Sequence, residues 1–275
     1  MQTETRAPDG ASMVLHSTGD GPGVVVVHGG GVTVDVYRRL ASRLGRSCTV
    51  HLYNRRGRAD ASPRPGRWRV EQEVADLGAV LEQTGSRSVL GHSSGGFIAL
   101  TAARSLPVER LALYDAAVSV DGGFPAGWLD AAQAAVRDGD VARALALTSG
   151  GINTHSAASR LPLGLRTALC GLFLRTSIGR TMGSLLASTL DESRAVVEHD
   201  GPASAWSDVD AEVLLAYGTA GPPYYAPLNA ALGAALPRAH VLPVGRAGHD
   251  GINRAPDRLV VPLARFLRGE GAPAA

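Results

Sequence analysis

The fold is decided by the stretch Ser88-Val89-Leu90-Gly91-His92-Ser93-Ser94-Gly95-Gly96-Phe97. Residues 88–90 predict a short strand and residues 97–105 an apolar helix, so Ser93 lies in the turn between them. A tight turn of this kind needs Gly91 and Gly95, because side chains there would collide with the backbone. The Gly-x-Ser-x-Gly spacing between a strand and a helix is typical of a serine raised above a sheet. We therefore predict that Ser93 is a nucleophile.

Strand and helix patterns alternate on both sides of this turn. Strands are predicted at residues 24–27, 48–53, 88–90, 108–114, 213–217 and 240–244. Helices are predicted at residues 36–44, 70–83, 97–105, 225–236 and 259–267. This alternation predicts an α/β fold with a mostly parallel central sheet and helices on both faces.

The alternation stops between residues 120 and 207, where the pattern is helical or irregular. A helical segment inserted into a series of strands and helices predicts a cap over the carboxyl edge of the sheet. We expect a core domain of residues 1–119 and 208–275, and a helical cap subdomain of residues 120–207.

The overall composition limits the classes of function. The chain has 275 residues, 45% of them hydrophobic, enough for one sizeable core. Its net charge is only +2 and it has no long basic run, which argues against nucleic acid as a partner. Its apolar stretches are far shorter than the roughly 20 residues of a membrane span, and residues 1–13 lack the apolar region of a secretory signal. We therefore expect a cytoplasmic protein that acts on a small molecule; the oligomeric state is left open.

We expect no cofactor and no metal. His, Asp and Glu do not cluster at ligand spacings, and the glycines at 29–31 do not follow a nucleotide-binding pattern.

His249 is the best candidate for the base that activates Ser93. It lies in a flexible loop, residues 245–251, between the last strand and the last helix. From this loop an imidazole can reach the edge of the sheet. The alternatives are less well placed: His16, His51 and His240 on strands, and His155 and His199 in the insertion.

Acyl transfer also needs two N–H donors for the developing oxyanion. The backbone amide of Ser94 supplies one, and Gly30 is our choice for the other, with Gly31 as the reserve. For substrate contacts we predict His28, Gly29, Gly31, His92 and Trp128.

Four motifs together resemble those of the α/β-hydrolase superfamily. They are the strand followed by His28-Gly29-Gly30-Gly31, the loop Asn54-Arg55-Arg56-Gly57-Arg58, the serine motif and Gly248-His249. The chain looks like bacterial members with a helical cap, which implies an α/β-hydrolase fold and esterase, lipase, thioesterase, lactonase or peptidase chemistry. The resemblance is weak within the insertion.

The chain departs from this pattern at the acid that orients the histidine. Much of the superfamily has an Asp after the strand at residues 213–217, but Gly218 to Pro223 offers no carboxylate. Some relatives, resembling haloalkane dehalogenases, place the acid after the preceding strand, which here ends at Asp115. We therefore assign the role to Asp115, with Asp121 and Asp250 as alternatives.

These observations predict a serine hydrolase that cleaves an ester, thioester or lactone of a medium-sized apolar acyl substrate. Two alternatives stay open: an acyltransferase or cyclase with the same triad, and a binding protein without catalysis, suggested by the missing carboxylate near Gly221. We expect Arg55, Arg56 and Arg58 to be solvated or paired with loop carboxylates. The apolar residues expected to enclose the substrate are Trp128, Leu161, Leu163, Leu165, Leu172, Phe173, Leu174 and Trp206.

Overall fold

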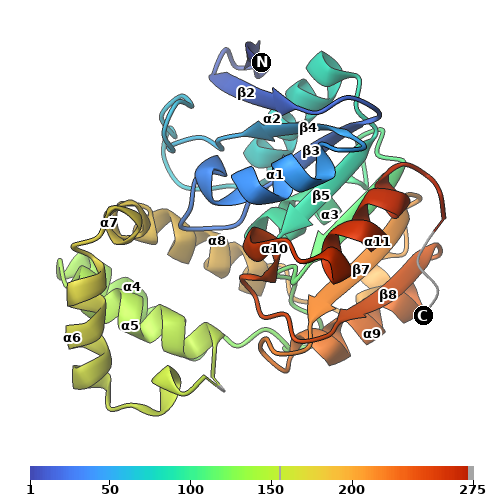
Figure 1. The fold of residues 1–275 in the computed structure, drawn as a ribbon. Helices are drawn as coiled ribbons and strands as arrows, with labels where there is room; N and C mark the ends of the chain where they lie inside the picture. The colour runs from blue at the N-terminus through green and yellow to red at the C-terminus, as the bar shows by residue number, and fades with distance from the viewer. Residues whose placement is uncertain (155, 272–275) are drawn as a thin grey trace.

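An eight-stranded sheet forms the centre of the protein, whose computed structural model describes residues 1–154 and 156–271 (Figure 1). The strands are β1 (Gln2–Arg6), β2 (Ser12–Thr18), β3 (Gly23–Val27), β4 (Thr49–Tyr53), β5 (Ser88–His92), β6 (Arg110–Tyr114), β7 (Glu212–Gly218) and β8 (Ala239–Val244). Their order across the sheet is β1-β2-β4-β3-β5-β6-β7-β8. β2 is antiparallel to both of its neighbours, and the strands from β4 to β8 are parallel. The prediction of a mostly parallel sheet is confirmed.

The six predicted strands are all present, and two further strands, β1 and β2, precede them in the chain. β1 lies at the edge of the sheet and buries only Thr5. A strand with one buried residue shows no alternation of apolar and polar positions, so periodicity could not reveal it.

Two layers of helices cover the sheet. The helices outside the insertion are η1 (Val34–Tyr37), α1 (Arg38–Leu44), α2 (Val70–Thr84), α3 (Ser94–Ala102), α9 (Tyr225–Ala235), α10 (Gly251–Arg254) and α11 (Asp257–Leu267). α1, α10 and α11 pack on one face, and α2, α3 and α9 on the other. This arrangement places the loops that follow the parallel strands at one edge of the sheet.

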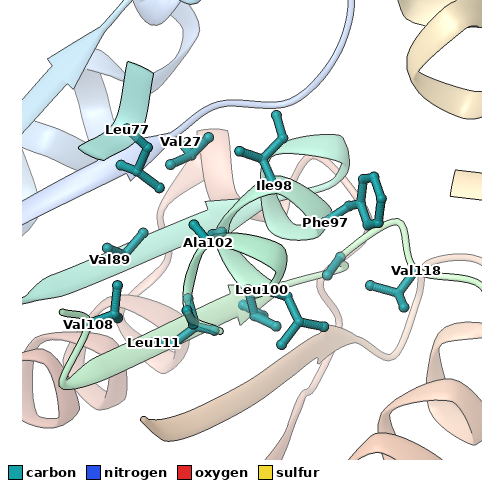
Figure 2. Close-up of a cluster of buried hydrophobic side chains, with 14 of the residues drawn as sticks. Val27, Leu77, Val89, Phe97, Ile98, Leu100, Ala102, Val108, Leu111 and Val118 are labelled. Atoms are coloured by element: carbon teal, nitrogen blue, oxygen red, sulfur yellow. The ribbon is translucent and has the colours of Figure 1, made fainter. Parts of the chain in front are cut away.

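Helix α3 anchors the serine turn in the core. Figure 2 shows Phe97, Ile98 and Leu100 of this helix among the buried residues of the sheet, including Val89 and Leu111. The helix begins at Ser94, directly after Ser93, rather than at Phe97 as predicted. It can begin this early because its first turn contains two glycines and approaches the sheet closely.

A helical insertion lies between β6 and β7, to one side of the sheet (Figure 1). Its helices are α4 (Leu129–Arg137), α5 (Val141–Ile152), η2 (Ala158–Arg160), α6 (Leu163–Phe173), α7 (Ser177–Ser184), α8 (Leu186–Glu198) and η3 (Ala203–Trp206). It has a small core of its own around Leu129, Leu145 and Leu190. His155, one of the alternative bases, lies outside the described residues.

None of the helices at residues 1–154 and 156–271 combines the length and the apolar character needed to cross a lipid bilayer.

Candidate active site

Ser93 occupies a strained turn at the carboxyl end of β5. Its backbone has φ 55° and ψ −126°, a conformation rare for a residue with a side chain. Its N–H donates to the carbonyl of Tyr114 at 3.2 Å, and its own carbonyl accepts from the amides of Gly96 at 2.8 Å and Ala117 at 2.9 Å. A Cβ atom added at Gly95 would lie 2.2 Å from the carbonyl oxygen of Val27, so only glycine fits. The neighbouring strands thus hold the serine in its strained conformation.

Asp115 and His249 form a partly buried pair beside the serine. Asp115 follows β6 and is fully buried, and its Oδ2 lies 3.1 Å from Nδ1 of His249. Its other oxygen accepts a hydrogen bond from the amide of Gly218 at 3.0 Å. A carboxylate at Nδ1 favours the tautomer with the proton on that nitrogen, which leaves Nε2 free to accept a proton.

The carboxylate of Asp115 lies next to the loop that follows β7. A Cβ atom added at Gly221 would lie 3.6 Å from Oδ2 of Asp115. The alternative acids are elsewhere: Asp121 is exposed, and Asp250 binds Arg254 at 2.7 Å. The structure therefore brings only Asp115, of the three candidates, to the His249 ring.

Aromatic side chains fix the imidazole on two sides. The ring of Tyr225 stacks on His249 at 5.8 Å with an interplanar angle of 4°, and its hydroxyl lies 3.4 Å from Nδ1. The ring of His92 lies 4.6 Å away on another side, and the hydroxyl of Tyr37 lies 2.5 Å from Nδ1 of His92. Burial, assisted by the nearby charge of His249, lowers the pKa of His92 well below its usual value, so this ring is neutral.

Two backbone amides lie close to the serine. Ser94 is the first residue of α3, where N–H groups have no partner within the helix. The loop from residue 29 to 31 supplies the other candidates, of which Gly30 lines both cavities described below. Gly29 is already engaged, because its amide donates to the hydroxyl of Tyr37 at 3.0 Å. This arrangement favours Gly30 and Ser94 as the donor pair.

Two cavities meet at Ser93 and His249. The more polar of the two, here called the polar cavity, has a volume of about 510 Å³ and has among its lining residues Gly29, Tyr37, His92, Asp250 and Asn253. The apolar cavity, of about 260 Å³, has among its lining residues Gly31, Ala117, Phe124, Leu145, Ile152, Leu186, Val196 and Tyr225. Gly30, Ser93, Asn153, Met182 and His249 line both. No hydrogen bond joins Ser93 to His249 among the described residues, a looseness common before substrate binds.

Several predicted contacts lie away from these cavities. His28 is buried behind the loop, where its Nε2 accepts from the amide of Arg55 at 3.2 Å. Trp128 belongs to the small core of the insertion and donates to the carbonyl of Pro125 at 2.8 Å. The other apolar residues expected to enclose the substrate line neither cavity, and Leu165 and Leu172 are exposed. The insertion instead contributes residues of α5 and α8 to the apolar cavity. No sequence motif indicated that these residues face the serine.

Similarity to known proteins identifies the family of this chain. The family model described as "Alpha/beta hydrolase family" matches residues 24–262. The chain belongs to the alpha/beta hydrolase family.

Individual known proteins resemble this alpha/beta hydrolase over different lengths of its chain. An alpha/beta hydrolase from Sphaerobacter thermophilus DSM 20745 superposes with a TM-score of 0.75 at 26% identity, covering 94% of this chain and 99% of that one. The esterase RhEst1 from Rhodococcus sp. ECU1013 has a TM-score of 0.67 at 19% identity, with 98% and 99% covered, which shows the shared fold. "Uncharacterized hydrolase YraK" of Bacillus subtilis (strain 168) is 34% identical over 95 residues, or 33% of this chain. That match spans 35% of the relative's own length.

A buried charge network supports the site of this alpha/beta hydrolase from below. Arg55 pairs with Glu73 at 2.9 Å and with Glu192 at 3.1 Å, and Arg58 also pairs with Glu192. The expectation that the three arginines at 55, 56 and 58 are solvated or paired with loop carboxylates is wrong. All three are buried, and their carboxylate partners lie mainly on helices α2 and α8. The arginines can be buried because carboxylates neutralise their charge, and the carbonyls of His28 and Gly29 accept further hydrogen bonds from Arg55 and Arg58.

Glu192 connects the insertion to the serine turn, and the motifs gave no sign of it. Its Oε2 accepts a hydrogen bond from Oγ of Ser94 at 2.5 Å, and a Cβ atom at Gly30 would lie 3.2 Å from the same oxygen. Burial alone would raise the pKa of Glu192, but the charges of Arg55 and Arg58 outweigh it and lower the pKa. The carboxylate is therefore ionised directly behind both candidate oxyanion donors.

Proposed function

We propose that this protein is a serine hydrolase that cleaves a carboxylic ester, thioester or lactone through an acyl-enzyme on Ser93. The observation that carries the proposal is that Ser93, in its strained turn, and His249, paired with the buried Asp115, line the same two cavities. An imidazole oriented by a carboxylate, next to a serine and two free amides, is the arrangement that acyl transfer requires.

In the proposed mechanism Oγ of Ser93 attacks the carbonyl carbon while Nε2 of His249 takes its proton. The negative oxygen of the tetrahedral intermediate accepts from the amides of Gly30 and Ser94. The C–O or C–S bond then breaks, and the imidazolium gives its proton to the leaving group. Water, deprotonated by His249, attacks the acyl carbon of the acyl-enzyme. The bond between that carbon and Oγ of Ser93 breaks, the imidazolium returns its proton to Oγ, and the acid leaves. Asp115 holds the tautomer and stabilises the imidazolium in both halves.

The two cavities suggest how the substrate is divided. The acyl chain enters the apolar cavity, since burying apolar surface there is favourable by about 25 cal/mol per Å². The leaving group occupies the polar cavity, where the side chains of Asp250 and Asn253 offer hydrogen-bonding groups. The helical insertion acts as a cap in this proposal, because its helices α5 and α8 supply one wall of the acyl site.

The alternative of a binding protein without catalysis loses its motivation. It arose from the missing carboxylate near Gly221, and the carboxylate of Asp115 lies next to that position and contacts His249. An acyltransferase or cyclase would use the same steps with an internal hydroxyl or amine in place of water, so product analysis separates it from a hydrolase.

The test is turnover of p-nitrophenyl esters of increasing acyl length, with mass analysis of the products. We expect hydrolysis of medium-length esters, and a loss of several orders of magnitude in kcat in Ser93→Ala. Ile152→Trp, which narrows the apolar cavity, is expected to shift the preference to shorter acyl chains. The matched control Asp250→Asn, in the polar cavity alone, is expected to leave that preference unchanged. Unaltered turnover in Ser93→Ala would refute the proposal.

A further inference from the structure

We propose that the outer face of α6 and α7 docks on an anionic lipid surface. This α6–α7 face consists of Leu165, Leu169, Leu172 and Phe173 on α6 and Ile178 on α7. In Figure 1, α6 lies at the outer edge of the insertion and α7 lies between it and α8.

The α6–α7 face concentrates exposed apolar surface. Its side chains are 49%, 48%, 59%, 36% and 58% exposed in chain order, whereas outside the insertion only Met1 and Val261 are comparable among the described residues. None of the residues of α6 is buried. Single exposed leucines are ordinary, but five large apolar side chains exposed within fourteen residues mark an interaction surface.

The two sides of α6 differ in their contacts. Cys170 and Leu174 pack against the small core of the insertion, and Arg166 donates to the carbonyl of Ala146 on α5 at 3.2 Å. These positions are spaced by four residues and form one side of the helix. Leu165, Leu169 and Leu172, spaced by four and three, form another stripe, whose side chains remain largely exposed.

The charge around this face favours an anionic partner. Residues 141–190 contain five arginines and no Asp or Glu. Arg160, Arg175 and Arg180 are exposed, and none of the three forms an ion pair within the described part of the chain. A second copy of the chain docked through the same face would bring arginines against arginines, whereas anionic headgroups would neutralise them. An apolar stripe flanked by arginines is the pattern of a helix that lies in a lipid interface.

The α6–α7 face also adjoins the candidate active site. Arg166, Leu169 and Cys170 line a depression of about 240 Å³ together with Asn153. Asn153 in turn lines both cavities at Ser93. On the proposed function, an ester dissolved in the lipid surface would therefore have a short route to the serine.

Vesicle sedimentation tests the docking surface with the full chain. We expect binding to vesicles of phosphatidylcholine containing phosphatidylglycerol, weakened by salt, and little binding to phosphatidylcholine alone. Arg175→Gln with Arg180→Gln should weaken binding about 25-fold, since each basic residue contributes roughly fivefold at an anionic surface. Leu165→Ser with Leu169→Ser and Leu172→Ser should weaken it about tenfold or more, because the apolar insertion is lost.

Two matched controls accompany these variants. Arg39→Gln and Val261→Ser change exposed residues of the same kinds on α1 and α11, and are expected to bind as the unaltered protein does. Ser93→Ala should also bind normally, which separates the docking surface from the proposed catalysis. Equal binding to both vesicle types, or no binding to either, would overturn the proposal. So would self-association abolished by the leucine substitutions in a protein that binds no vesicles.

Discussion

Asp115 is the residue on which the candidate triad depends. It is placed by β6 rather than by the loop after β7, it has a positive φ of 44°, and both of its carboxylate oxygens have partners. The burial of this carboxylate and its contact with Nδ1 of His249 make it the group that sets the tautomer of the imidazole.

We predict that Asp115→Asn lowers kcat for ester hydrolysis by about 10⁴-fold with little change in the fold, because the amide stabilises the wrong tautomer. Asp121→Asn and Asp250→Asn should stay within a few-fold of the unaltered enzyme. Steady-state kinetics of the three variants checks this. A large loss in Asp250→Asn together with a small loss in Asp115→Asn would reverse the assignment.

At the residue scale, the sequence predicted the groups that carry a motif or end a strand. Ser93, His249 and Asp115 are of this kind, and the structure brings the latter two together. Tyr225 and Glu192 could not be predicted, because they lie on helices and reach the site only through tertiary packing. His28 failed as a contact for the opposite reason: it follows a strand next to the site, but its ring turns inward.

At the scale of elements, α8 joins the insertion to the sheet through charge. Glu192 on this helix is buried with Arg55 and Arg58, and its carboxylate accepts a hydrogen bond from the hydroxyl of Ser94. Residues of α8 therefore line the apolar cavity, and Glu192 of the same helix contacts the serine turn at Ser94.

We predict that Glu192→Ala lowers the free energy of unfolding by about 3–5 kcal/mol, since it removes the only carboxylate partner of Arg58 among the described residues. The control is Arg194→Ala on the same helix, which breaks an exposed ion pair with Asp130 and should cost less than about 1 kcal/mol. Urea unfolding of both variants measures the difference. Similar losses in the two variants would show that the buried network does not anchor α8.

The positions of most core elements were predictable because their apolar periodicity is strong. The orientation of the inserted helices was not: leucines expected to face the substrate, such as Leu165 and Leu172, face outward. Periodicity identifies one side of a helix as apolar, but it does not say whether that side meets the core, a cavity or another surface.

At the scale of the whole molecule, two buried neutral imidazoles link stability to pH. Burial lowers the pKa of His28 and of His92 well below the usual value, assisted at His28 by the charges of Arg58 and Arg55. In the unfolded chain both would titrate near pH 6.5. Below that pH the unfolded chain binds protons that the native state does not, so stability falls as pH falls.

We predict that the free energy of unfolding is level above about pH 7 and declines below pH 6.5 by up to about 3 kcal/mol per pH unit, since each histidine contributes about 1.4. His51, whose pKa burial also lowers, adds to the decline in the same direction. Glu73 and Glu192, whose pKa values are lowered by Arg55, lose their contribution only below this interval of pH 6.5 to 5. Urea titrations at pH 7.5, 6.5, 5.5 and 5.0 test the prediction. A level stability across this range would contradict it.

The central claim is that Ser93 is an activated nucleophile, and covalent labelling tests it most directly. The intact protein is incubated with a fluorophosphonate, and the modified residue is identified by mass spectrometry. We predict stoichiometric labelling at Ser93, strong slowing of the labelling in His249→Ala and no label in Ser93→Ala. A folded protein whose Ser93 stays unmodified, or in which another residue takes up the label, would contradict it.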